Sequence, residues 1–490
     1  MAAPVVTAEP ASDRVWSIET NGINAIPEDE RHGRPAELFW IWFASNISLL
    51  SILYGAIAVG FGLNLWQSIL AGLIGVWISF LLVGFISLAG VRGGSPTLVL
   101  SRASFGIFGN ILPNLASYIS LLGWEAVLVA TSVLATNTLV HRLGLATGRL
   151  ETAVAFVIIA GIVIGIGLLG HATILRIETW FTWAFAILTV VFVVLEAPHI
   201  HLSALASAPS GNWLSGFIPA VSIIMAGLGI GWVNAAADYS RYLPRRASGG
   251  SVVAWTTVGA SIAPFLLIVF GALLAGSSPQ LAKQAGGNPI TGLAQYLPTW
   301  FLVPYLIAAV GGLVAGAVLD IYSSGLNLLT LGVRLARYKS VAIDGTVMVL
   351  GNIYILFVAS NFLNTFQGFL FALGVPLAVW SAIFLVDMAM FHRQGYNVAA
   401  LYAVLAPYRI MAGVNPAAVV AFIAGTVVGL GLVTNATFTW LGWWTSDLPS
   451  SFANSSIGLF VGFGIGAVLY FLLSVPRLLE QRQLEEAPSL

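Results

Sequence analysis

The sequence contains no cysteine, and only 8% of its 490 residues are charged. The absence of cysteine excludes disulfide bonds and thiolate metal sites, although it does not indicate a cellular compartment. Soluble globular domains usually carry about 25% charged residues, so this chain is not an ordinary soluble domain. Its formal net charge is +0, which gives no reason to expect nucleic acid as a partner.

Hydrophobic residues make up 58% of the chain. They gather in about twelve apolar runs, each near the length of about 20 residues that a helix needs to cross a bilayer core. We therefore predict an all-α polytopic protein of the lipid bilayer, with spans near 38-63, 66-90, 111-140, 151-170, 174-196, 213-236, 252-276, 299-325, 345-364, 366-390, 415-433 and 455-475.

The distribution of cations predicts the orientation, because Lys and Arg in short loops resist translocation. Of the 19 Lys and Arg residues, only Arg142, Arg149 and Lys283 fall on one side of the predicted topology. Both termini are therefore expected in the cytoplasm, which requires an even number of spans. Residues 1-35 lack the apolar stretch of a cleavable signal peptide, so the first span is expected to be an uncleaved anchor in the cell membrane.

Two of the predicted spans are interrupted, and they lie five spans apart. The interruptions are Phe43-Ala44-Ser45-Asn46 and the glycine-rich run from Ala226 to Gly231. Broken spans survive in a membrane only where the freed backbone groups line a cavity or hold a ligand. Matching breaks in two halves are typical of secondary transporters built from inverted repeats, whose substrate site lies between the breaks.

This pattern predicts a five-plus-five inverted repeat of the LeuT type, with helices 1 and 6 broken. The expected organisation is a cytoplasmic tail, a ten-helix core made of two repeats, two further helices and a second tail, at residues 1-37, 38-390 (38-196 and 213-390), 391-475 and 476-490.

Several motifs resemble the nucleobase:cation symporter-1 family and, within it, the purine-cytosine permease branch. The most specific is Ala237-Asp238-Tyr239-Ser240-Arg241-Tyr242-Leu243-Pro244. The others are Gly22-Ile23 with Glu30-Arg31, Phe39-Trp40-Ile41-Trp42 with Asn46, Ser101-Arg102-Ala103-Ser104-Phe105-Gly106, Gly123-Trp124 and Ile321-Tyr322-Ser323-Ser324-Gly325-Leu326. The resemblance implies the same inverted-repeat fold and the uptake of a small heterocycle.

The resemblance also implies a substrate site. An aromatic residue of span 3 stacks on the flat substrate in the family, and Trp124 occupies that position. Stacking of a base on an aromatic side chain contributes about 1–3 kcal/mol in nucleic-acid proteins. Ser45 and Asn46 at the first break are expected to hydrogen-bond an edge of the heterocycle.

At the second break, the bare backbone of Gly229 and Gly231 is expected to approach the ligand closely. Trp232 follows directly, and it is equally consistent with a pocket wall or with packing. Asp238 and Arg241, at the inner end of span 6, fit either a gate or a helix-end pair that sets topology.

Two carboxylates are predicted inside the membrane region, Glu125 in span 3 and Asp320 in span 8. A charge at that depth costs at least about 2.5–3.5 kcal/mol, which favours the protonated form of an acid. We expect one of them to couple transport to protons or to hydrogen-bond the substrate. Glu125 follows Trp124 directly, but successive helical residues point about 100° apart and need not share a pocket.

The chain departs from the family on span 8. Sodium-using relatives present paired hydroxyls there, whereas this chain has Ala315-Gly316, and the stretch from Gly312 to Leu319 lacks the family's substrate-binding asparagine. Hard oxygen ligands favour sodium, so their loss favours the proton as coupling ion.

The resulting hypothesis is a proton-coupled symporter for cytosine, adenine or hypoxanthine. The alternatives are sodium coupling, or the same mechanism for allantoin, a hydantoin or a vitamin-like heteroaromatic. No paired carboxylates, His-rich motif or nucleophile elbow indicates an enzyme, and no cofactor or metal site is expected. A monomer is sufficient for this mechanism.

Overall fold

The computed structural model describes residues 23–145, 148–167, 171–277, 289–293, 297–333, 337–359, 361–403 and 413–486. Every regular element in these ranges is helical, as the sequence predicted. Most of the N-terminal tail, the end of the C-terminal tail and Lys283 lie outside the described residues.

Within the described residues, ten helical segments are long and apolar enough to cross a membrane, and a bent pair raises this to eleven. The bent pair is α1 (Glu37–Asn46) and α2 (Leu49–Gly60). It is followed by α3 (Leu65–Gly93), α6 (Ile111–Arg142), α7 (Arg149–Gly167), α8 (His171–Glu196), the interrupted α10 (Ile218–Gly227), α11 (Gly229–Trp232) and α12 (Ala236–Ser240), α13 (Gly249–Ser277), α16 (Thr299–Thr330), α17 (Arg337–Ile353), α18 (Phe362–Phe391) and α22 (Gly458–Glu486).

The predicted span 415-433 corresponds to α20 (Pro416–Gly431), which has 16 residues. It is shorter than the other spans, although it packs along α18 and α22. The predicted span 345-364 was placed too late, because the apolar segment begins at Lys339. Hydropathy excluded this polar first turn, whereas the fold accepts it since Asp344 finds buried partners there.

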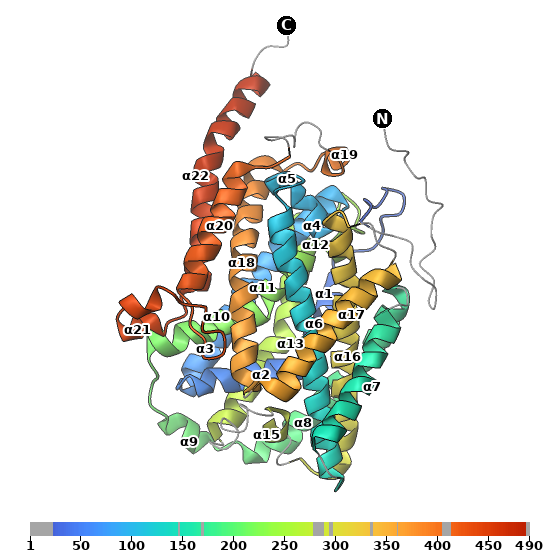
Figure 1. Cartoon of the computed structure of the whole chain (residues 1–490), viewed down its shortest axis with the longest axis vertical. Helices are drawn as coiled ribbons and strands as arrows, with labels where there is room; N and C mark the ends of the chain where they lie inside the picture. Colours follow the sequence, from blue (N-terminus) through green and yellow to red (C-terminus); the bar gives the residue numbers. More distant parts are fainter. Residues whose placement is uncertain are drawn as a thin grey trace.

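The short connecting helices separate into two groups at opposite ends of the molecule (Figure 1). At the end where α22 projects lie α4 (Thr97–Leu100), α5 (Arg102–Phe105) and α19 (Val398–Leu401). At the other end lie α9 (Leu202–Ser207), α15 (Pro289–Leu293) and α21 (Ser450–Ala453). This division follows the alternation of loops that the sequence predicted.

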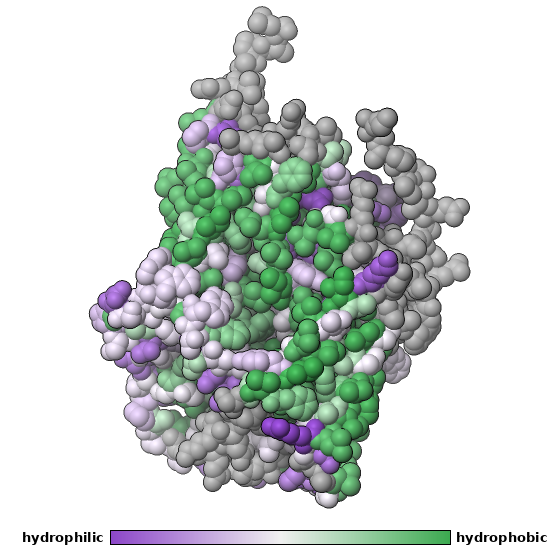
Figure 2. All heavy atoms as spheres, in the orientation of Figure 1, coloured by the Kyte–Doolittle hydropathy of each residue, from purple (hydrophilic) through white to green (hydrophobic). Residues whose placement is uncertain are grey.

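The surface between the two ends is apolar. Figure 2 shows hydrophobic residues across most of the visible face. The exposed large hydrophobic side chains of α7, α17 and α22 include Val157, Leu350 and Leu472. Contiguous exposed apolar surface of this extent is costly in water and fits contact with lipid.

The contacts among the central helices recur when the first five-helix set is exchanged for the second. Helix α3 packs on α13, and α6 packs on α16. The broken α1 and α2 contact α13, while the broken α10 to α12 contact α3. Helix α7 contacts α6 as α17 contacts α16, and α8 contacts α16 as α18 contacts α6. Each of these contacts of one five-helix set therefore has a counterpart in the other set.

The second half of the first span is held by a close helix crossing. A Cβ atom at Gly55 on α2 would overlap the carbonyl oxygen of Ile268 on α13. We expect Gly55→Ala to lower the free energy of unfolding by about 1–3 kcal/mol or more, as overpacking usually does. Thermal unfolding of the purified protein in detergent measures this loss.

Gly60→Ala is the matched control, because no atom lies within 4 Å of a Cβ atom at Gly60. This variant is expected to keep the stability of the parent protein. Equal stability of the two variants would contradict the close crossing.

Candidate functional site

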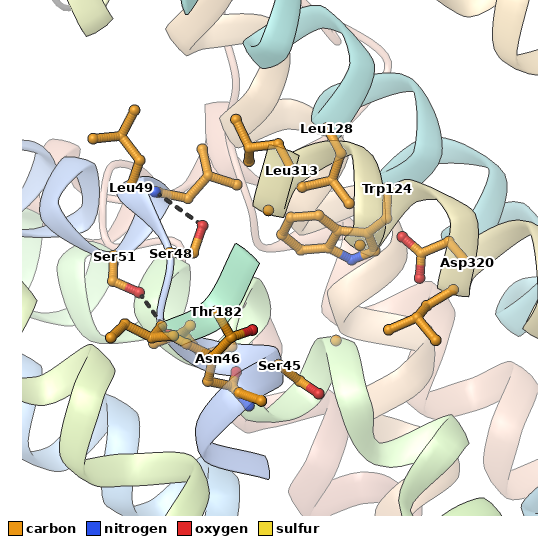
Figure 3. Close-up of a pocket in the computed structure, with 18 of the residues that line it drawn as sticks. Ser45, Asn46, Ser48, Leu49, Ser51, Trp124, Leu128, Thr182, Leu313 and Asp320 are labelled. Atoms are coloured by element: carbon orange, nitrogen blue, oxygen red, sulfur yellow. Dashed lines mark hydrogen bonds between the residues drawn. The ribbon is translucent and has the colours of Figure 1, made fainter. Parts of the chain in front are cut away.

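A cavity lies between the two helix breaks and is closed on its other sides by α6, α8 and α16 (Figure 3). The first break contributes Ser45, Asn46 and Ser48, and the second contributes Gly227, Leu228, Gly231 and Trp232. The facing helices contribute Trp124 and Leu128, Phe181, Thr182 and Phe185, and Gly312, Leu313, Gly316 and Asp320.

The first break lies slightly later than the sequence predicted. Helix α1 continues to Asn46, and Ile47 and Ser48 have extended backbones, so the axis turns by 62° into α2. The side chain of Ser48 accepts the Leu50 N–H at 3.3 Å and begins α2 as its N-cap. The second break falls within the predicted run, at Leu228 between α10 and α11.

Side chains from neighbouring spans satisfy the backbone groups that the second break frees. The Tyr54 hydroxyl of α2 donates to the carbonyl oxygen of Gly227 at 3.1 Å. The N–H of Gly229 donates to Ser79 Oγ of α3 at 3.2 Å. Because buried unpaired backbone groups are costly, these contacts stabilise the break before any ligand binds. The site is therefore preformed.

Trp124 lies on the cavity wall (Figure 3). Its ring is braced edge-to-face by Phe366 and Phe369 of α18, at centroid distances of 5.9 and 5.5 Å. The bracing restricts rotation of the indole and presents it to the cavity at low entropic cost. A rigid aromatic wall of this kind suits a planar ligand.

Ser45 and Asn46 both reach the cavity, and each donates one hydrogen bond within its own helix. Ser45 Oγ donates to the carbonyl oxygen of Ile41 at 2.9 Å, and Asn46 Nδ2 donates to that of Trp42 at 2.9 Å. Ser45 can therefore offer the cavity an oxygen acceptor, and Asn46 can offer its Oδ1 acceptor and its second N–H donor.

The glycines of the second break divide between two environments. Gly231 faces Trp124, since a Cβ atom there would lie 3.3 Å from the indole Nε1. Gly229 was expected to approach the ligand, but it packs against the backbone of Ser79 on α3 and is not part of the cavity wall. Its missing side chain serves the close approach of α11 to α3. Trp232 lines the cavity and also packs edge-to-face on Trp42 at 5.7 Å.

The two acids expected in the membrane region, Asp320 and Glu125, lie in different environments. Asp320 lies on the cavity wall close to Trp124 (Figure 3). Glu125 is fully buried and lies outside the cavity, where its Oε1 accepts a hydrogen bond from Ser324 of α16 at 3.2 Å. The turn of the α6 helix between Trp124 and Glu125 sends the two side chains in different directions.

Among the buried acids that the sequence reasoning missed are Asp344 and Asp387, both 0% exposed. Asp344 stood one residue before a predicted span, and Asp387 stood inside one, so the hydropathy profile itself could have revealed the second. Asp387 joins three segments, because Ser104 and Tyr470 donate to its carboxylate and His392 forms an ion pair with it at 3.2 Å. Asp344 lies in the same polar cluster as Glu125.

Asp238 and Arg241 do not form a solvated helix-end pair. Asp238 accepts hydrogen bonds from the backbone N–H and the hydroxyl of Thr97, at 2.7 and 2.8 Å. Arg241 is 2% exposed, and its guanidinium lies over the Tyr242 ring. Asp238 thus ties the end of the sixth span to the loop helix α4, on the side of the cavity expected to face the cytoplasm.

Comparison with known proteins places this geometry in context. Residues 25–448 match the family described as permease for cytosine/purines, uracil, thiamine, allantoin. The protein YxlA of Bacillus subtilis is 27% identical over 96% of this chain and 98% of its own length. The purine-cytosine permease FCY2 of Saccharomyces cerevisiae is 26% identical over 78% of this chain and 73% of its own length.

Among solved structures, the fold is similar to that of Mhp1, a nucleobase-cation-symport-1 family transporter in a closed conformation with bromovinylhydantoin bound. The TM-score is 0.68 at 20% identity, with 93% of this chain and 96% of Mhp1 covered. This likeness confirms the predicted inverted-repeat fold.

Proposed function

The chain belongs to the family of permeases for cytosine/purines, uracil, thiamine and allantoin, and from this premise we propose that it imports a nucleobase by proton-coupled symport. It is a multi-pass membrane transporter and not an enzyme. The observation that carries the proposal is the cavity between the two breaks, where an indole wall and several hydrogen-bond acceptors meet.

The polar groups of the cavity support a substrate rich in N–H donors. Ser45 and Asn46 offer oxygen acceptors, and Asp320 adds a carboxyl group on the opposite wall. Cytosine and adenine carry an amino group beside ring nitrogens and match such acceptors while stacking on Trp124. We propose these two bases as the preferred substrates, with hypoxanthine, which lacks the amino group, bound more weakly.

The wall opposite the first break supports the proton over sodium. Gly312 and Gly316 of α16 line the cavity without side-chain oxygen, and the first ionisable group along that face is Asp320. A proton needs one titratable group, whereas sodium needs several hard oxygen ligands. In the proposed cycle, base and proton bind from outside, and one helix bundle rocks against the other to open the site inward. Cytoplasmic termini and residence in the cell membrane are part of this proposal.

The test is uptake of labelled cytosine, adenine and hypoxanthine into proteoliposomes under an inward proton gradient, an inward sodium gradient or neither. We expect proton-driven accumulation, with cytosine or adenine preferred. Sodium-driven accumulation would contradict the coupling proposal and assign the ion to backbone carbonyls.

A second cargo class is tested in the same assay. Mhp1 binds a hydantoin, and the stretch from Gly312 to Leu319 holds no asparagine to pair with a base amide. Allantoin and bromovinylhydantoin are therefore included as labelled substrates. Accumulation of one of them without any base would replace the nucleobase proposal while leaving the transport mechanism in place.

A further inference from the structure

A second polar cluster lies beside the cavity, between α6, α16 and α17. Ser324 of α16 stands at its centre, one helical turn beyond Asp320. Its Oγ lies 3.2 Å from Oε1 of Glu125, 2.8 Å from Oδ2 of Asp344 and 2.9 Å from the carbonyl oxygen of Ile321. One hydroxyl therefore bridges two carboxyl groups from two other helices.

The number of hydrogen atoms limits how this bridge can be made. A serine hydroxyl has one hydrogen to donate, and here three oxygen atoms surround it. Whichever oxygen receives that hydrogen, at least one carboxyl oxygen then faces a lone pair of Ser324. Such a contact is repulsive unless the carboxyl group carries a proton and donates it to Ser324. The geometry thus requires at least one proton on Glu125 or Asp344.

The other partners indicate which acid carries the proton. Asp344 accepts a hydrogen bond from the Tyr118 hydroxyl and lies 3.4 Å from Ser340 Oγ. These two hydroxyls stabilise a negative charge on Asp344 better than the single Ser324 contact does on Glu125. Glu125 is 0% exposed, and its Oε2 has no hydrogen-bond partner within the described part of the chain. If Glu125 is neutral and donates to Ser324 Oγ, Ser324 can donate to a charged Asp344, so that neither carboxyl group faces a lone pair of the bridge.

We propose that Glu125 and Asp344 share one exchangeable proton across Ser324 and that this is the proton carried with the substrate. The proposal rests on the proposed function and adds Asp344, on the ninth span, to the transport machinery. Asp320 stands on the cavity wall one turn away and gives the pair access to a proton that enters with the base.

Proton release then has a mechanical consequence. When the O–H bond of Glu125 breaks and the proton passes to water on the inner side, two carboxylates remain around one hydroxyl. Their mutual repulsion in a poorly hydrated site disfavours the close packing of α6 against α17. Loading and release of the proton therefore favour different separations of these helices.

Several titratable groups lie on the helices packed around the pair. On α16 the facing titratable group is Asp320, and on α6 it is Tyr118. Lys339 of α17 occupies an exposed position, and α7 carries its charges in the first turn at Arg149 and Glu151. Asp387 of α18 is held by Ser104, Tyr470 and His392.

The test is Asp344→Asn in proteoliposomes, with Asp447→Asn in an exposed loop turn as the control. Two readouts separate coupling from folding: exchange of labelled base without a gradient, and base-dependent proton uptake followed with a trapped pH dye. We expect the Asp344→Asn variant to retain exchange and lose both proton uptake and accumulation. The control is expected to keep all three.

Two results would overturn the proposal: unchanged proton uptake in Asp344→Asn, or loss of exchange together with accumulation in a folded variant, which indicates a structural role. If Asp344→Asn does not fold, Ser324→Ala decides, because it keeps both acids and removes the bridge. The proposal requires that the pH profile of accumulation by Ser324→Ala is shifted from that of the parent protein. An unchanged profile refutes the proposal.

Infrared spectroscopy of the purified protein tests the shared proton without any transport. The proposal requires a protonated-carboxyl band that disappears in Glu125→Gln and shifts in Asp344→Asn. Absence of the band in the parent protein refutes the shared proton. If the band is present and no base is transported, the proposed substrate has failed while the acid pair stands.

Discussion

Replacing Trp124 with alanine is expected to abolish effective uptake while leaving the protein folded in the membrane. The indole supplies the flat wall of the cavity, and Phe366 and Phe369 hold it in place. Loss of base stacking costs about 1–3 kcal/mol, which corresponds to about 5- to 150-fold weaker binding. Substrate affinity measured by calorimetry or by competition for uptake gives this change directly.

Two further variants make the result specific. Trp124→Phe keeps an aromatic face of smaller area, so its loss of affinity is expected to be smaller than that of alanine. Trp66→Ala removes an indole that is 77% exposed at the start of α3, and it is expected to leave affinity unchanged. If Trp124→Ala binds the base as tightly as the parent protein does, the stacking role is refuted and the residue is structural.

Replacing Glu125 with glutamine is expected to eliminate proton-driven accumulation and to preserve exchange. Glutamine has the shape of the neutral carboxylic acid, so the contact with Ser324 is kept, but it has no proton to release. Accumulation by the parent protein is expected to fall as external pH rises, because fewer molecules carry the proton. The exchange rate of the variant is expected to be independent of pH across the same interval.

The pH dependence is measured as initial rates of accumulation and exchange at matched membrane potential. Glu151→Gln, in the first turn of α7, is the matched control and is expected to keep the slope of the parent protein. A parent-like pH slope in Glu125→Gln would show that another group, with Asp320 the first candidate, holds the coupling proton.

The membrane fold was largely predictable from local features of the chain. Apolar runs with few charges determine spans because hydrocarbon accepts only a hydrogen-bonded, apolar helix. The two breaks were visible for the converse reason, since Ser45 and Asn46 or a run of glycines cannot belong to an ordinary span. The errors include Lys339–Val358, where buried partners compensate the polar start of the helix, and the first break, which lies at Ile47 and Ser48.

The cavity was predictable in part. Trp124, Asn46 and Gly231 reach it because each belongs to a motif or a break that local sequence reveals. Phe181 and Thr182 of α8 could not be assigned, since nothing in their own segment distinguishes a cavity-facing residue from a lipid-facing one. Gly229 was misassigned for a related reason, because a glycine that admits a ligand and one that admits a neighbouring helix look the same in a sequence.

The sequence by itself thus determined that the chain spans a membrane, that two spans are broken and that an aromatic residue and two acids lie within spans. These properties depend on the chemistry of short segments. Only the tertiary structure decided which acid faces the cavity and which faces a second carboxylate, because Glu125, Ser324 and Asp344 are far apart in the chain. The rotation of α6 and the packing of α16 and α17 bring them together, and a linear pattern does not encode that rotation.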